Sequence, residues 1–174
     1  MTQDTRMQEA RAYLSHQAQK GMAEMAAMMA RTAGECADAL ADINDEQASF
    51  KDGEEWSVKE IVGHMLSSGA AVNREIANLV KGGESPPPGR TGVTAGGDRP
   101  IAELRERMAA LWDETRRLVG SLPAEATPQG TWEHPFFGQL NFKEWIAFQR
   151  LHALDHVQQI EKVKTHADYP AAGP

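Results

Sequence analysis

The stretch that decides the fold is N-F-K-E-W-I-A-F-Q-R-L-H-A-L-D-H-V-Q-Q-I, residues 141–160. It predicts a helix from Asn141 to about Lys164, because Asn141 is a favourable N-cap and Glu144 completes a capping box three residues later. Apolar side chains surround almost the whole cylinder of this helix, so we expect it to lie deep in the core. A central helix of this kind needs other helices to cover it.

Three further segments show apolar residues three and four apart, the spacing that is typical of amphipathic helices: Thr5 to Leu40, Ser57 to Lys81 and Asp98 to Gly120. In the first of them, Met22, Met25 and Met29 form an apolar stripe. Gly21 and Gly34 weaken the helix locally, and Gly34 would allow a kink or an early end. The chain is therefore expected to contain four long helices.

No segment shows the alternation of a strand bounded by turn residues, so the sequence predicts an all-α fold: a four-helix bundle with long crossover loops. The longest connection, Gly82 to Arg99, contains the prolines 86–88 and cannot be a helix or a central strand. Either a function or low complexity would account for it. We expect one domain over residues 1–166 and a disordered tail over residues 167–174.

Composition narrows the class of protein. The formal net charge of the 174 residues is −7, which disfavours nucleic-acid binding. No apolar run approaches the roughly 18 residues of a membrane span, and the N-terminus lacks the apolar core of a signal peptide. The single cysteine, Cys36, excludes an internal disulfide framework and fits a reducing compartment. We expect a cytoplasmic protein that binds neither nucleic acid nor membrane.

Three histidines are the candidate metal ligands. His152 and His156 are four residues apart, so they share one helix face with their Cβ atoms about 5–6 Å apart and could chelate one ion. His64 lies on another predicted helix and could supply a third nitrogen, since bundle sites are built from facing helices. Three neutral imidazoles around a divalent transition metal leave coordination positions open for water or substrate. The sequence therefore predicts a metal site at His64, His152 and His156.

A metal-free alternative accounts for the same residues. An unpaired buried ring nitrogen costs roughly 1–3 kcal/mol, and hydrogen bonds from Gln149 or Gln159 could meet that need. Imidazole suits zinc, nickel, iron and copper, and the sequence does not rank zinc against nickel. No carboxylate is placed as a clear fourth ligand. Glu60, one turn before His64, is a candidate for orienting that ring, although helix capping explains it as well.

Three motifs carry a resemblance to a known family. They are W-S-V-K-E-I-V-G-H-M at 56–65, H-P-F-F-G at 134–138, and the stretch at 141–160. Together they resemble the DinB/YfiT-like family. The resemblance implies a four-helix bundle over almost the whole chain, and it implies that His64 is the first metal ligand and that the H-x-x-x-H pair supplies the other two.

The resemblance also implies nickel or zinc as the metal, a frequent homodimer and a connection to bacterial stress genes. Relatives include thiol-dependent S-transferases and a thiol-dependent maleylpyruvate isomerase. The expected function is therefore a metalloenzyme that uses a low-molecular-weight thiol on a small-molecule substrate, as an S-transferase or as a related hydrolase or isomerase. The alternatives are a non-catalytic metal-binding stress-response protein and a plain structural bundle.

Other candidate residues have simpler explanations. Cys36 could be a nucleophile, but no histidine neighbours it in sequence, so a structural role is favoured. His134 could line the mouth of a pocket, although H-P is typical of a turn. Arg116 and Arg117 could meet an acidic thiol, whereas a solvated helix face is the default for such a pair.

Overall fold

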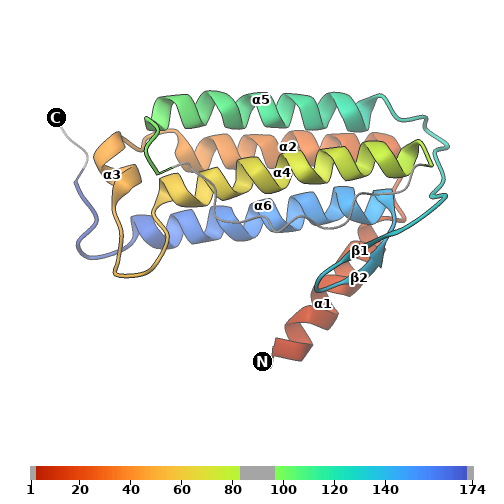
Figure 1. Cartoon of the computed structure of the whole chain (residues 1–174), viewed down its shortest axis with the longest axis horizontal. Helices are drawn as coiled ribbons and strands as arrows, with labels where there is room; N and C mark the ends of the chain where they lie inside the picture. Colours follow the sequence, from red (N-terminus) through yellow and green to blue (C-terminus); the bar gives the residue numbers. More distant parts are fainter. Residues whose placement is uncertain (1–2, 83–96, 172–174) are drawn as a thin grey trace.

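The computed structural model describes residues 3–82 and 97–171, and its centre is a bundle of four long helices (Figure 1). They are α2 (Met22–Leu40), α4 (Val58–Val80), α5 (Ile101–Gly120) and α6 (Phe142–Lys164). Each packs against two others, in the order α2, α5, α4, α6 and back to α2. Consecutive helices α4 and α5 run in the same direction, whereas α6 runs antiparallel to α4. The predicted helical bundle is confirmed.

Capping boxes fix the first turns of α4 and α6, the two helices that carry the candidate ligands. Ser57 Oγ accepts the backbone N–H of Glu60 at 3.3 Å, and the Glu60 carboxylate accepts the backbone N–H of Ser57 at 2.8 Å. Asn141 and Glu144 repeat the exchange in α6, at 3.0 and 3.1 Å. Both helices therefore begin where the sequence predicts.

The single helix expected from Thr5 to Leu40 is wrong, because the chain forms two helices there: α1 (Gln3–Gln17) and α2. Gly21 is extended, with a ψ of 157°, and its N–H donates to the Glu24 carboxylate at 3.3 Å. Glycine loses more backbone entropy in a helix than any other residue, which makes an interruption at this point cheap. Gly34, by contrast, lies inside α2 without ending it.

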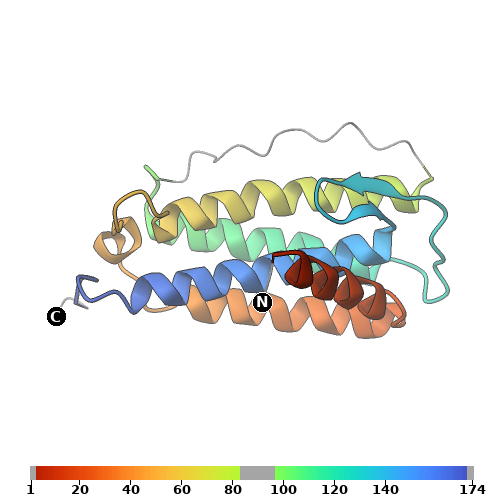
Figure 2. The same cartoon turned by 90° about the horizontal axis from the view of Figure 1, so that it is seen from below.

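Helix α1 leaves the bundle at an angle and crosses α6 (Figures 1 and 2). Its C-terminal half is fastened there. Leu14 is fully buried, and the Arg11 guanidinium donates to the Glu144 carboxylate at 2.6 Å. Ser15 adds a hydrogen bond to the same carboxylate at 3.2 Å. Helix α1 therefore lies outside the four-helix bundle and is bound to the first turn of α6 by these contacts.

Two short elements correct the prediction that the chain has no strands. Strands β1 (Trp132–His134) and β2 (Gly138–Leu140) form an antiparallel hairpin, and Gly138 has a φ of 68°, which glycine adopts without a steric cost. A five-residue helix, α3 (Asp45–Ser49), precedes α4. Elements of three to five residues are too short to show the periodicity from which a strand or helix is inferred.

His134 holds the turn of this hairpin. Its Nδ1 accepts the backbone N–H groups of Phe136 at 3.1 Å and Phe137 at 3.3 Å. The ring is buried against Phe148 on α6, with ring centroids 4.4 Å apart. The turn role typical of H-P is therefore the one that the structure shows.

The methionine stripe of α2 forms part of the core, as predicted, since Met22, Met25 and Met29 are all buried. Helix α6 contacts α1, α2 and α4, and most of its N-terminal half is buried. Among its side chains, Ile146 is fully enclosed. The expectation of a central α6 is met at this end, while the last turns of the helix are partly exposed.

The long connection and the expected tail are only partly covered by the described residues. Positions 83–96 of the connection and positions 172–174 of the tail lie outside them. Within the part of the chain that the structure describes, no helix combines the length and the apolar character needed to cross a bilayer.

Residues 167–171 lie against the region of α3. Gln47 donates to the carbonyl oxygen of Pro170 at 3.0 Å, and the rings of Phe50 and Tyr169 meet edge-on with centroids 5.6 Å apart. These contacts attach the described part of the tail to the bundle. A domain boundary at residue 166 stays a prediction.

Replacement of Ile146 by Ala should lower the free energy of unfolding by about 2–5 kcal/mol, because it removes buried methylene groups and leaves a cavity. Urea denaturation measures this change. The matched control is Phe136→Ala: Phe136 is 75% exposed, so its loss should stay within about 0.5 kcal/mol. Equal losses in the two variants would contradict the assignment of Ile146 to the core.

The protein should also become less stable as the pH is lowered, because His134 takes up a proton more readily in the unfolded chain. Burial lowers the pKa of His134 to about 4, from 6.5. Between these values the unfolded chain binds the proton and the folded chain does not, so acid favours unfolding. Asn can accept the same backbone N–H groups but does not titrate. His134→Asn should therefore show a flatter dependence of unfolding free energy on pH between about 6.5 and 4, by at most about 1.4 kcal/mol per pH unit. Parallel pH profiles for wild type and variant would refute this role.

Candidate metal centre

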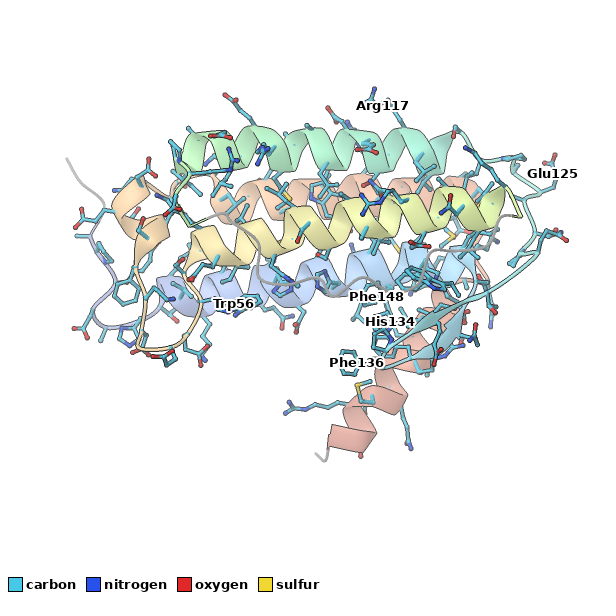
Figure 3. The ribbon with its side chains drawn as sticks, in the orientation of Figure 1. Trp56, Arg117, Glu125, His134, Phe136 and Phe148 are labelled. Atoms are coloured by element: carbon cyan, nitrogen blue, oxygen red, sulfur yellow. The ribbon has the colours of Figure 1, made fainter. Side chains whose placement is uncertain are left out.

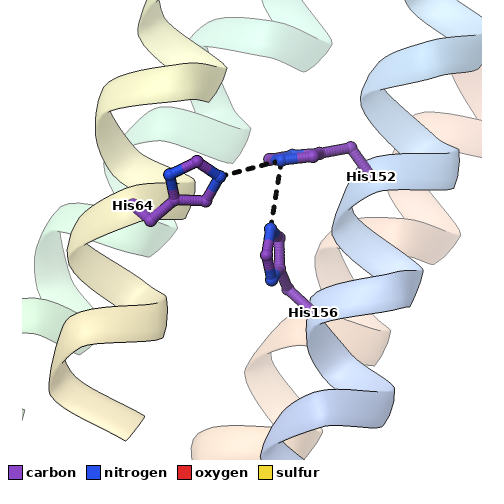
Figure 4. A group of neighbouring side chains, drawn as sticks. All are labelled: His64, His152 and His156. Carbon is purple, nitrogen blue, oxygen red and sulfur yellow. Dashed lines mark hydrogen bonds between the residues drawn. The ribbon is translucent and has the colours of Figure 1, made fainter. Parts of the chain in front are cut away.

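The three candidate histidines come together where α4 packs against α6 (Figure 4). The Nε2 atom of His152 lies 3.1 Å from Nε2 of His64 and 3.1 Å from Nε2 of His156. One ligand atom from each ring lies within 4.8 Å of the others. Residues separated by 88 positions in the sequence thus form a single cluster of imidazole nitrogens.

Local structure explains this convergence. The spacing of four residues places His152 and His156 one turn apart on the same face of α6. His64 lies in the second turn of α4, just after the Ser57 cap. Because α6 runs antiparallel to α4, the second half of α6 lies beside the first half of α4. The pair and the single ring therefore meet at one depth.

His156 is held in the tautomer that a metal ligand needs. Its Nδ1 lies 2.9 Å from the Oε1 atom of Gln159, and a carboxamide oxygen can only accept a hydrogen bond. Nδ1 therefore carries the proton, and Nε2 of the neutral ring presents its lone pair to the cluster. Gln159, one of two glutamines expected to satisfy the pair, does so for His156.

The donor set fits a divalent transition-metal ion. Nitrogens about 2.0–2.1 Å from one ion, at tetrahedral to octahedral angles, are about 2.8–3.4 Å apart. Both contacts of His152 have this spacing. The ligand atoms of the third pair, His64 and His156, lie within 4.8 Å of each other. Imidazole donors suit nickel and zinc alike.

Burial favours the neutral form of His64 and His152. It lowers the pKa of His152 to about 3, and the neighbouring His156 and His64 lower it further in the same direction. Burial, followed by the neighbouring His156, also lowers the pKa of His64. Only the neutral imidazole binds a metal, so protons compete weakly for these two rings near neutral pH.

Aromatic side chains flank the cluster along α6 (Figure 3). The Trp56 ring lies 5.2 Å from the His64 ring and nearly parallel to the His156 ring, at 6.4 Å. On the other side, Phe148 lies 5.5 Å from His152. These rings surround the nitrogens with low-polarity surface, which strengthens electrostatic interactions inside the site.

A hollow of about 390 Å³ adjoins the cluster, and Glu54, Glu55, Trp56 and Gln159 form its wall. Trp56 packs on the rings of the cluster and Gln159 bonds to His156, so two side chains that contact the ligands also line the hollow, while the three histidines do not. Sequence reasoning missed this role of Trp56. The available signal was its position next to the Ser57 cap, which keeps it near the first turns of α4.

Glu60 does not orient His64. Its carboxylate accepts from Ser57 at 2.8 Å and from Lys51 at 3.0 Å, so capping occupies it. The Nδ1 atom of His64 is buried and has no hydrogen-bond partner among the described residues. Asp155, which lies between the two histidines of the pair in sequence, is exposed.

Cys36 and the arginine pair stay outside the site. Burial raises the pKa of the Cys36 thiol to about 12, so the nucleophilic thiolate is strongly disfavoured. Arg116 pairs with Asp113, and Arg117 donates to the backbone oxygen of Asp113 at 3.2 Å. Both arginines lie on the exposed face of α5, which packs against α2 and α4.

Fold and site together define a helical-bundle protein whose three convergent histidines could bind a metal ion. A model of the DinB superfamily matches residues 28–160, which include all four bundle helices in whole or in large part and all three histidines. The chain belongs to the DinB superfamily. Comparison with curated proteins gave no match, and comparison with solved structures gave none either.

Replacement of His152 by Ala should abolish the binding of a stoichiometric divalent ion, because the Nε2 atom of His152 lies between the other two. Elemental analysis of protein purified without a chelator or an affinity tag measures the metal, and circular dichroism checks that the helices remain. His16→Ala is the matched control, since His16 is exposed on α1, outside the cluster. Metal content that survives His152→Ala would refute the site.

Proposed function

We propose that this protein binds a nickel or zinc ion through His64, His152 and His156 and uses it to activate a low-molecular-weight thiol for transfer to a small electrophilic molecule. The observation that carries the proposal is the convergence of the Nε2 atoms of three histidines from α4 and α6. A bound divalent ion would lower the pKa of a thiol or a water molecule and so supply a nucleophile at neutral pH.

The charge of the site supports an anionic ligand. All three donors are neutral imidazoles, and the cluster includes no carboxylate among the described residues. A divalent ion held there would keep its full positive charge in surroundings of low polarity, where attraction to an anion is stronger than in water. Three protein ligands also leave coordination positions open. A thiolate satisfies both conditions.

The side chains around the cluster would position the reactants. Gln159 holds the proton on Nδ1 of His156, which keeps Nε2 available. Trp56 and Phe148 exclude water from either side, and the adjoining hollow has room for a small molecule. Holding two reactants next to each other removes much of the entropic cost of their encounter.

The assembly and location of the protein are part of the proposal. The DinB resemblance supports a homodimer, and the single cysteine fits a reducing cytoplasm. Light scattering of the purified protein would measure the mass of the assembly.

The thiol chemistry can be tested on protein loaded with one equivalent of cobalt, nickel or zinc. Addition of glutathione or 2-mercaptoethanol to the cobalt form should produce a thiolate-to-metal charge-transfer band. The nickel or zinc form should accelerate the reaction of the thiol with 1-chloro-2,4-dinitrobenzene at least about tenfold over thiol alone.

Both signals should disappear in His152→Ala and persist in His16→Ala. A protein that binds the metal but gives neither signal would instead be the non-catalytic metal-binding alternative. Hydrolysis or isomerisation of a substrate without thiol would point to the related chemistries expected from the sequence.

A further inference from the structure

A small cavity of about 10 Å³ lies behind the metal ligand His152, inside the bundle. Its wall comes from α4, α5 and α6 and is mostly apolar, but His152 and Gln149 bring an imidazole and a carboxamide to it. These two residues are three positions apart on α6. The cavity therefore connects a candidate metal ligand to a buried polar side chain that the proposed function does not use.

Gln149 is 3% exposed, and its Oε1 atom has no hydrogen-bond partner among the described residues. A buried acceptor left in this state costs about 1–3 kcal/mol. A volume of roughly 10–15 Å³ is what a single water molecule needs, and buried waters occur beside unsatisfied polar groups. The cavity next to Gln149 has the size and polarity of a site for one water molecule.

Gly69 on α4 makes the room for this carboxamide. A Cβ atom at position 69 would lie 2.7 Å from Leu111 Cδ2 and 3.0 Å from Gln149 Nε2, closer than side chains tolerate. Glycine inside a helix costs up to about 1 kcal/mol relative to alanine. Gly69 therefore lowers the stability of α4 locally, and the space that it leaves allows a polar side chain to be enclosed at this point.

His152 needs an acceptor for its second nitrogen. Its Nε2 atom lies in the cluster, so a lone pair there requires the proton on Nδ1. Ligating histidines generally donate this proton to an oxygen. His156 donates to Gln159, three residues after it. Gln149, three residues before His152, brings an unpartnered oxygen to a cavity that both residues line.

We propose that Gln149 is a positioning residue of the metal centre, acting on His152 through one buried water molecule. The water accepts the Nδ1 proton of His152 in a hydrogen bond and donates one of its own hydrogens to Gln149 Oε1. This bridge fixes the His152 ring in the tautomer whose Nε2 atom faces the metal. The inference rests on the proposed metal binding and assigns one glutamine to each ligand of the pair.

The test uses Gln149→Met, which keeps the size of the side chain and removes the acceptor. Gln158→Met is the matched control, since Gln158 is exposed on the same helix. Zinc affinity is measured by competition with a chelator, and urea denaturation reports the stability of each metal-free protein.

Gln149→Met should weaken zinc binding about 10- to 100-fold without a loss of metal-free stability, whereas Gln158→Met should bind within about threefold of wild type. A purely structural glutamine would give the reverse: lower stability and unchanged affinity. Unchanged affinity in Gln149→Met would overturn the proposal.

A second measurement reads the hydrogen bond of Nδ1 in the zinc-loaded protein, in which Nε2 of His152 is bound to the ion. Long-range ¹H–¹⁵N NMR should show the His152 Nδ1 proton exchanging slowly with bulk water in wild type and faster in Gln149→Met. Equal exchange in both proteins would overturn the role of Gln149. If wild type takes up no zinc, the proposed function fails. If wild type and Gln149→Met bind zinc equally, only the role of Gln149 fails.

Discussion

The antiparallel contact between α4 and α6 is the constraint on which the site depends. Each helix presents its histidines to the other only in one packing register, because consecutive side chains differ by about 100° around a helix. In α4 the buried neighbours Ile61 and Met65 set this register, while the Ser57 and Asn141 capping boxes fix where α4 and α6 begin. A rotation of α4 by one residue would turn His64 away from the pair. Packing along two capped helices thus brings together nitrogens that are 88 residues apart.

The cluster is costly for the metal-free fold. It places three imidazoles close together, two of them with lowered pKa values, and it leaves Nδ1 of His64 and Oε1 of Gln149 without partners among the described residues. Apolar side chains at the same positions would pack without these costs. Departures from the rules of stable packing concentrate at functional sites, where another gain compensates for them. The buried polar atoms therefore lie where the proposed ion, and the hydrogen bonds to its ligands, would offset the free-energy cost of burying them.

The sequence predicts those parts of the molecule that local chemistry determines. The caps at Ser57 and Asn141, the spacing of the histidine pair and the apolar faces of the bundle helices are all visible in short windows, and the structure has them. The break before Gly21 and the hairpin around His134 depend on contacts with α6, which no window contains. For the same reason, the position of Trp56 beside the rings and the cavity at Gln149 could not be predicted, since each needs the packing of several helices.

Helix α1 lies outside the matched family region, yet it contacts α6, the helix that carries two of the candidate ligands, through Glu144. This carboxylate is 6% exposed and has two tasks: one oxygen caps α6 by accepting from Asn141, and the other accepts from Arg11 and Ser15 on α1. A buried carboxylate without its cation is strongly disfavoured, so the Arg11 contact stabilises the charged form that the cap uses. The cap in turn stabilises the first turn of α6, the helix that carries His152 and His156 two to four turns later. A helix at the edge of the bundle thus supports one of the two helices that form the site.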